Sequence, residues 1–305
     1  MKKKKKKNIF TRLNKIVLSI IFITSSSINI SAQYEPNKEF GILGGTGYYI
    51  GDMNSTHFNN LHVAGGIAYR VNFDRRFSFK ASALYTNIYA DDNPRGLTFE
   101  EAATEYAPDP IPINVNRNLH FKSNIFELSG QVEFNFLPYE TGNSLYNWSP
   151  FVFLGIATYS HNPMAEDKHG EWQNLQNLGT EGQGTTKFPE RKKYALTQLS
   201  IPFGGGVKIG VSPSFNIIFE YGLRKTSTDY LDDVSTTYIF DPASSSQAWP
   251  TDMSDLAQEL SDRSLSAGNM QIEMARGDDT NNDWYSVSAI TLSFRIKGNK
   301  KGCDY

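Results

Sequence analysis

The feature that most constrains this chain is an alternation of apolar and polar residues with a period of two, which recurs about eight times. In one such segment, residues 215–224, the apolar series is Phe215, Ile217, Phe219, Tyr221 and Leu223. Successive side chains of a strand point to opposite faces, so this segment has one apolar face and one mainly polar face. A series of long strands of this kind in an exported protein favours an outer-membrane barrel, apolar toward lipid and polar toward its lumen.

The N-terminus carries the pattern of an export signal. Residues 1–15 are strongly basic, residues 16–23 form an apolar run, and a small, polar stretch ends at Ser31-Ala32-Gln33. This order predicts a cleaved secretory signal over residues 1–32, followed by a barrel domain over residues 33–305. A membrane anchor is the alternative, but the apolar run is far shorter than the roughly 20 residues of a spanning helix. We therefore expect Sec-dependent export and an integral outer-membrane location.

Removal of the signal changes the charge of the protein. The full chain has 30 Lys and Arg against 32 Asp and Glu, and residues 1–32 hold eight of the basic residues and no acidic one. The mature chain therefore has 22 basic against 32 acidic residues, a net charge of −10. A nucleic-acid partner would require a basic face, so the sequence argues against one. The single cysteine, Cys303, excludes a disulfide within the chain.

Eight segments carry the alternation and predict an all-β, antiparallel transmembrane barrel. They are residues 39–49, 61–71, 77–86, 126–136, 151–159, 201–211, 215–224 and 290–296. The connections between them alternate between long and short, at about 11, 4, 31, 12, 36, 3 and 54 residues. A barrel with both termini in the periplasm places long loops outside and short turns inside. We expect bulges at Gly44-Gly45 and near Ala289-Ile290.

Charged residues recur on the face of the strands that would line the lumen. They are Arg70, Lys80, Glu127, Glu133, Lys208, Glu220 and Arg224. An eight-stranded barrel is just wide enough inside to be filled by side chains. The sequence thus predicts interior ion pairs and no conducting pore, with a proton or ion path through these charges as the alternative.

Four groups of loop residues resemble a known family. They are Tyr49-Ile50-Gly51-Asp52; Leu178-Gly179-Thr180-Glu181-Gly182-Gln183-Gly184; Thr228-Asp229-Tyr230-Leu231-Asp232-Asp233-Val234-Ser235; and Arg276-Gly277 with Asp283-Trp284-Tyr285. In this order, and at positions that suit a barrel, they are similar to the PorG family. That family consists of outer-membrane barrels of the type IX secretion system of Bacteroidetes. The resemblance spans residues 39–296.

The resemblance implies a scaffold without chemistry of its own and without a cofactor. Such a protein would sit in outer-membrane lipid and anchor the periplasmic ring, built from a lipoprotein and its partner, of a machine that exports proteins and supports gliding. The turn 137–148 and the tail 297–305 would be its contacts with the ring. A generic barrel for adhesion or tethering is the alternative, and a lipid-modifying barrel enzyme is a further one.

Candidate catalytic and metal-binding residues are few. The five histidines are His57, His62, His120, His161 and His169, and only His62 or His120 with a nearby serine would suit a hydrolase. Residues 278–283 are rich in oxygen ligands and would suit Ca²⁺, but a turn with Asx hydrogen bonds explains them equally well. Asp229, Asp232 and Asp233 leave the same two interpretations open.

Two loop segments have a predicted local structure. The glycines of residues 179–184 lack the lysine of a phosphate-binding loop, so they indicate backbone with positive φ. Residues 252–265 have the pattern of a short amphipathic helix that packs over the barrel mouth. Residues 111–116 and 236–240 could extend neighbouring strands, which leaves the strand count open.

Overall fold

The computed structural model describes residues 34, 36–243, 248–266 and 270–296. The chain divides into two units between Glu35 and Pro36, and the predicted signal and tail lie outside the described residues. The second unit contains eight long strands. They are β1 (Asn37–Ile50), β2 (His62–Asn72), β3 (Phe77–Asp91), β4 (His120–Asn135), β5 (Trp148–Ser160), β8 (Thr197–Ser212), β9 (Phe215–Thr226) and β10 (Trp284–Ile296).

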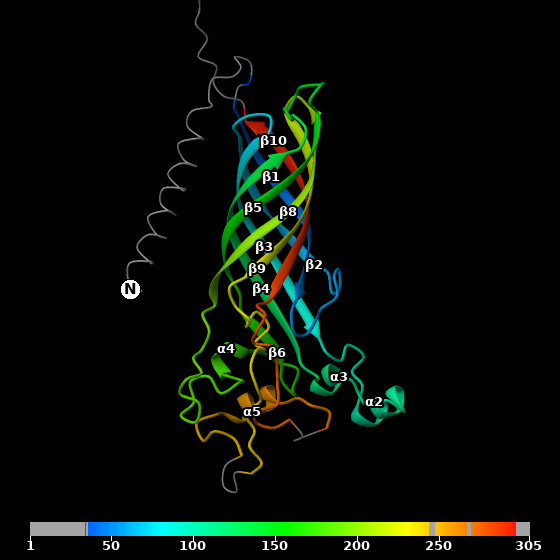
Figure 1. Ribbon diagram of the computed structural model, residues 1–305, viewed down its shortest axis with the longest axis vertical. Coiled ribbons are helices and arrows are strands. Elements are labelled where there is room, and N and C mark those ends of the chain that lie inside the picture. The colour runs from blue at the N-terminus through cyan, green and yellow to red at the C-terminus, as the bar shows by residue number, and fades with distance from the viewer. Residues whose placement is uncertain (1–33, 35, 244–247, 267–269, 297–305) are drawn as a thin grey trace, which may run out of the picture. The chain divides into compact units, whose positions relative to one another are not determined.

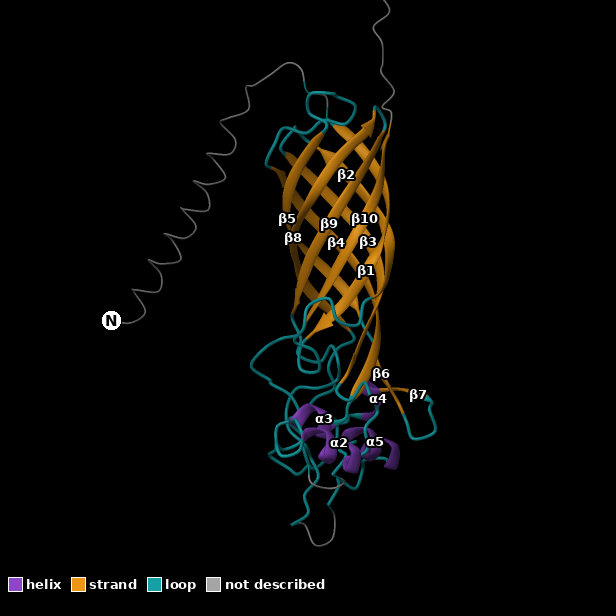
Figure 2. Ribbon diagram, turned by 90° about the vertical axis from the view of Figure 1, so that its right-hand side faces the viewer, coloured by secondary structure: helices purple, strands orange, loops and turns teal. Residues whose placement is uncertain are grey.

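The eight strands form a closed antiparallel barrel (Figures 1 and 2). Each strand pairs with its sequence neighbour in the barrel, and β1 pairs with β10 to close it. The predicted all-β fold of about eight antiparallel strands is therefore confirmed. Among the described residues, no helix is long and apolar enough to cross a membrane.

The alternation in the sequence becomes an inside and an outside of the barrel. Large apolar side chains on the outward phase are exposed, as Val63 (78 %) and Ile156 (70 %) illustrate. Aromatic side chains gather on the outside near the short turns, where Phe77 contacts Phe134 at a ring-centroid distance of 5.2 Å. The outer surface is thus an apolar belt with an aromatic rim.

Short turns and long loops are sorted to opposite ends of the barrel. Residues 73–76, 136–147 and 213–214 form the turns, and β1 begins and β10 ends at the same end as these turns. The long loops at the other end are, in order along the chain, residues 51–61, 92–119, 161–196 and 227–283, and they carry the remaining elements (Figure 2). These are α2 (Phe99–Tyr106), α3 (Ile113–Arg117), β6 (Pro163–Glu166), β7 (Trp172–Asn174), α4 (Leu175–Leu178) and α5 (Asp255–Ser261).

The helices have local causes in the sequence. Thr98 and Glu101 form a capping box at the start of α2, which the sequence analysis did not identify as a helix. The helix predicted over residues 252–265 is confirmed as the shorter α5, whose N-cap Ser254 accepts from the Ala257 N–H. Residues 113–117 are helical, so they do not extend a strand.

The predicted bulges at Gly44-Gly45 and Ala289-Ile290 are wrong. The register between β1 and β10 runs through both pairs without a shift, and the irregularity lies between Gly210 and Ser212 instead. A Cβ atom on Gly45 would lie only 1.9 Å from the Ser288 carbonyl oxygen. Glycine is therefore needed there because neighbouring backbone approaches closely.

Candidate functional site

The charged residues predicted to line the lumen lie inside the barrel, all buried except the partly buried Glu220, and they form ion pairs across it. Glu133 is central, since its carboxylate accepts from Arg70 Nε at 2.8 Å and from Lys208 Nζ at 2.6 Å. Lys80 Nζ lies 2.5 Å from Glu220 Oε2, and Arg224 Nε lies 3.0 Å from Glu127 Oε2. All seven predicted residues therefore take part in ion pairs that fill the interior.

Glu39 is an eighth interior charge that the sequence analysis missed. Its carboxylate accepts from Arg70 Nη1 at 3.2 Å and from Thr141 Oγ1 at 2.6 Å. With Glu39 included, this interior set contains four basic and four acidic residues and is neutral. The signal was present, because Glu39 neighbours the outward Phe40 and so must face inward once the strand begins at Asn37.

The loop segments singled out from the sequence meet in one buried polar cluster at the loop end of the barrel. We call it the cap cluster, and it consists of Tyr49, Thr180, Glu181, Asp229, Asp232, Asp233, Arg276 and Asp283. These residues come from the end of β1, from the loop between β5 and β8, and from the loop between β9 and β10. The sequence places them up to 234 positions apart.

Two buried aspartates of the cap cluster share one tyrosine hydroxyl. Tyr49 Oη lies 2.5 Å from Asp232 Oδ2 and 2.9 Å from Asp283 Oδ1. The remaining oxygens accept backbone N–H groups, from Val234 to Asp232 and from Leu231 to Asp283, each at 2.9 Å. Burial raises the pKa of both aspartates well above the ordinary range, and their mutual proximity raises that of Asp283 further. The arrangement therefore favours the protonated form of these carboxyls more than solvent would.

Glu181 is the most fully bonded carboxylate of the cap cluster. Oε1 accepts from Arg276 Nη1 at 3.1 Å and from the Ser235 N–H at 2.9 Å. Oε2 accepts from the Thr236 N–H at 3.1 Å, the Thr236 hydroxyl at 2.7 Å and the Tyr230 hydroxyl at 3.1 Å. Glu181 thereby ties the third long loop to the fourth.

Asp233 makes a second connection between the same loops. It accepts from the Thr180 hydroxyl and from Tyr194 Oη at 2.6 Å, and Arg276 lies 3.9 Å away. Burial raises the pKa of Asp233 to about 6, although the charge of Arg276 opposes that shift. Tyr194 stacks on Tyr230 with ring centroids 4.8 Å apart, which adds an aromatic contact beside the cluster.

Asp229 differs from its neighbours because neither carboxylate oxygen has a hydrogen-bond partner among the described residues, while the side chain is only 8 % exposed. Burial raises the pKa of Asp229 to about 7, and the charges of Asp52 and Glu181 act in the same direction, although the nearby Ser235 hydroxyl opposes the shift. Fewer hydrogen bonds therefore offset the burial of this carboxyl than offset the burial of Glu181.

The glycines of the motif segments allow positive φ angles or close contacts that a side chain would hinder. Gly179, Gly182 and Gly184 have φ values of 67°, 80° and 82°, which confirms the predicted positive-φ backbone. A Cβ atom on Gly51 would lie 1.9 Å from Asp283 Oδ1 and 2.1 Å from Tyr49 Oη. Gly51 therefore leaves space for the shared hydroxyl.

The other motif residues lie around the cap cluster or outside it. Gln183 Oε1 accepts from the Glu181 N–H at 3.0 Å, and Asp52 accepts from the Asp278 N–H. Tyr285 lies inside the barrel and donates to Glu127 at 2.8 Å. Trp284 is only partly buried and lies beneath the Lys225 ammonium group, 5.4 Å from it, so it does not join the cluster.

Arg117 is a buried residue of the loop end that sequence reasoning missed. Its guanidinium donates to Asp92 at 2.7 Å, to the Asp52 carbonyl at 2.9 Å and to the Arg276 carbonyl at 2.7 Å. It thereby joins the second long loop to the first and fourth. No local pattern marks it, because all three partners are distant in the sequence.

The histidines do not form a catalytic arrangement in the described part of the chain, where no hydrogen bond joins a serine hydroxyl to a histidine ring. His62 lies against the Tyr89 ring, and His120 Nε2 accepts from the Glu166 N–H at 2.9 Å. His161 is buried against Tyr194, and burial lowers its pKa to about 4.

The acidic segment 278–283 has the hydrogen bonds of an Asx turn. The Asp278 carboxylate accepts from the Thr280 N–H at 3.1 Å and from Asn281 Nδ2 at 2.7 Å. Across the described residues, no group of three or more His, Cys, Asp or Glu side chains could hold a metal ion. The turn interpretation therefore accounts for this segment.

Comparison with known proteins finds similarity to small barrels at low identity. Ail of Yersinia pestis has a TM-score of 0.39 and 10 % identity, and Neisserial surface protein A has a TM-score of 0.39 and 6 % identity. The N-terminal β-barrel domain of Pseudomonas aeruginosa OprF has a TM-score of 0.32 and 9 % identity. Each comparison covers 86 % of this chain and 100 % of the other. No curated protein matches the chain.

A family model matches residues 14–238, which is most of the chain and includes seven of the eight barrel strands and the first three long loops. The chain therefore belongs to the family described as "Domain of unknown function (DUF6089)".

Proposed function

We propose that this protein is an integral outer-membrane barrel that anchors the periplasmic ring of a type IX secretion machine, as the resemblance to the PorG family suggests. It binds lipid through its outer surface and the ring through its short-turn end. It has no catalytic role in this proposal.

The apolar belt supports the membrane location. Exposed apolar side chains on the outward phase of all eight strands would be costly in water, and soluble proteins rarely expose patches beyond a few hundred Å². Closure between β1 and β10 gives the first and last barrel strands partners, which hydrocarbon requires of a spanning sheet. The sorting of long loops and short turns to opposite ends is also typical of outer-membrane barrels.

One observation carries the secretion role. The four motif segments, which are far apart in the sequence, supply the side chains of a single buried cluster. The long loops of any such barrel lie at one end, but these four segments also bond to one another through buried side chains, as a shared loop architecture would require. The convergence therefore supports descent from the same kind of barrel.

The short-turn end exposes several large apolar side chains, of which Leu145 is the most exposed among the described residues. Within the turn of residues 136–147, Tyr139 and Thr141 are buried at the barrel end, and Thr141 bonds to Glu39. Leu145 in the same turn is 83 % exposed. We expect the ring to contact this turn around Leu145.

The test is a pull-down of the tagged protein from detergent-solubilised outer membrane, followed by mass spectrometry. The wild type should recover the ring lipoprotein and its partner, and Leu145→Asp should lose them. Ile113→Asp is the matched control, because Ile113 is also highly exposed (71 %) but lies at the loop end. Absence of ring proteins from the wild-type sample would contradict the secretion role.

A tether or adhesion protein is the second candidate. The observation that favours it is the extent of the loop end, where three long loops are joined through a buried ion pair and a buried hydrogen bond. A barrel recovered without ring proteins but required for attachment of cells to a surface would support this candidate.

A further inference from the structure

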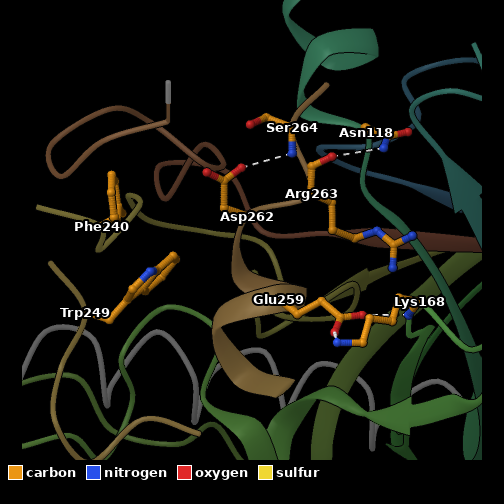
Figure 3. Close-up of a pocket in the computed structure, with 8 residues that line it drawn as sticks. All are labelled: Asn118, Lys168, Phe240, Trp249, Glu259, Asp262, Arg263 and Ser264. Atoms are coloured by element: carbon orange, nitrogen blue, oxygen red, sulfur yellow. Dashed lines mark hydrogen bonds and ion pairs between the residues drawn. The ribbon is translucent and has the colours of Figure 1, made fainter. Parts of the chain in front are cut away.

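A second site lies in the loop end, apart from the cap cluster. It is a hollow of about 480 Å³ between α5, the end of α3 and the turn between β6 and β7 (Figure 3). Its volume falls in the range of small-molecule sites. Phe240 and Trp249 lie on one side, and charged and amide side chains lie on the other.

The aromatic side of the hollow is fixed by contacts of Trp249 and of the residues next to the two rings. The ring centroids of Phe240 and Trp249 lie 5.2 Å apart. The Asp241 N–H donates to the Ala248 carbonyl at 2.9 Å, and this bond joins the backbone next to the two rings. Trp249 also packs against the buried cluster of Ile239, Met253 and Ala257. The rings therefore form a supported apolar surface.

The polar side is also fixed by contacts between loops. Asn118 Nδ2 donates to the Arg263 carbonyl at 2.9 Å, and the Lys168 N–H donates to Glu259 Oε1 at 2.6 Å. Arg263 Nη1 donates to the Glu166 carbonyl. Three long loops thus contribute to the wall of the hollow.

Both donors and acceptors at this wall remain available for further hydrogen bonds. Among the described residues, Asp262 accepts a hydrogen bond only at Oδ1, from the Ser264 N–H at 2.9 Å. Arg263 donates side-chain hydrogen bonds only through Nη1. An acceptor and several donors therefore lie along this wall, with the Asp262 carboxylate toward the aromatic side and the Arg263 guanidinium toward Lys168 (Figure 3).

The charges of the wall restrict the ligand. Lys168 and Arg263 are balanced by Glu259 and Asp262, so the four side chains sum to zero. A phosphate or sulfate would meet two carboxylates, and a purely apolar ligand would leave polar groups unpaired. A pyranose ring has hydroxyls that both donate and accept, and an apolar C–H face that packs on an aromatic ring.

We propose that this hollow binds a neutral saccharide of at least two rings, with Trp249 stacking on one ring, Asp262 hydrogen-bonding the hydroxyls of that ring and Arg263 those of a neighbouring ring. The saccharide is either a free oligosaccharide or the sugar portion of a membrane glycolipid. The proposal does not depend on the secretion role, since it concerns a different set of residues.

The test uses the full chain purified in phospholipid nanodiscs and saturation-transfer NMR with maltose, lactose and diacetylchitobiose. At least one of these should bind. Trp249→Ala and Asp262→Asn should weaken that binding by about tenfold, the effect expected from losing one hydrogen bond to a charged group or an equivalent contact. Asp262→Asn retains an oxygen for the Ser264 N–H, so its effect does not reflect unfolding of the loop.

Trp172→Ala is the matched control. Trp172 is another tryptophan of the loop end, but it lies beneath the Lys122 ammonium group, 3.3 Å from it, outside the hollow. This variant should bind like the wild type. Binding of none of the three sugars, equal binding by all variants, or displacement of the sugar by the zwitterion alanyl-alanine would overturn the proposal.

A second arm identifies the source of the saccharide. Nanodiscs are prepared with and without lipopolysaccharide that carries neutral core sugars. If the lipopolysaccharide competes with the free disaccharide in the wild type, the natural ligand belongs to the membrane. If it does not compete and the disaccharide still binds, the ligand comes from solution.

Discussion

At the scale of single residues, the molecule depends on charges that are removed from water and paired. Removing one partner of a buried ion pair leaves an uncompensated charge, which costs about 3–5 kcal/mol. Glu127 illustrates this, since it is fully buried and its one cationic partner among the described residues is Arg224.

Arg224→Met should therefore destabilise the barrel by about 3–5 kcal/mol. Lys225→Met is the matched control, because Lys225 is the next residue of β9 and lies exposed on the outer face. Urea unfolding followed by tryptophan fluorescence measures both. Equal stability of the two variants would show that the interior pairs do not hold the barrel together.

The cap cluster should respond to pH through Asp229. Its folded-state pKa of about 7 lies above the unfolded value of about 3.9, so the folded cap binds the proton more tightly. This contribution to stability is complete below the unfolded value and is lost as pH rises through about 7. Limited proteolysis should thus cut the cap loops faster at pH 8 than at pH 5.

Asp229→Asn should reduce that difference by protecting the cap at pH 8. Asp109→Asn, at an exposed position on the same end, should leave it unchanged. A wild-type pH dependence that persists in Asp229→Asn would assign the effect to other groups, such as Asp232 and Asp283.

At the scale of elements, the strands were predictable and most of the cap was not. Residues 215–224 and 77–86 carry a period of two, and the corresponding β9 and β3 differ from them mainly by extension toward the loops. α2 could have been found, since Thr98 and Glu101 form a recognisable capping box. The bulge prediction failed because glycine can also permit close backbone approach.

The composition of the cap cluster could not be derived from local patterns. Tyr49 and Asp283 are 234 residues apart, and only the closure of β1 against β10 brings them together. The sequence likeness selected most of these residues, but it could not show that they touch. Arg117 was missed for the same reason.

Gly51→Ala tests the junction between β1 and the cap cluster. The new methyl group would collide with Asp283 Oδ1 and Tyr49 Oη, so the loops should become sensitive to protease while the barrel remains folded. Gly44→Ala is the control, because a Cβ atom there meets nothing within 4 Å. A protease-resistant cap in Gly51→Ala would mean that the shared hydroxyl does not organise these loops.

At the scale of the whole molecule, an apolar belt lies between a loop end and a short-turn end. The interior is filled by a neutral set of ion pairs, and the loop end is joined through the cap cluster and Arg117. The short-turn end presents Leu145. Under the proposal that the barrel spans the outer membrane, the two ends lie on opposite sides of that membrane.

The most direct measurement is cysteine labelling of intact cells with a membrane-impermeant maleimide. In a Cys303→Ser background, Ile113→Cys should be labelled on intact cells. Leu145→Cys should be labelled only after the outer membrane is permeabilised, since it lies at the short-turn end. Labelling of Leu145→Cys on intact cells, or of neither cysteine before permeabilisation, would contradict a barrel that spans the outer membrane with its loops outside.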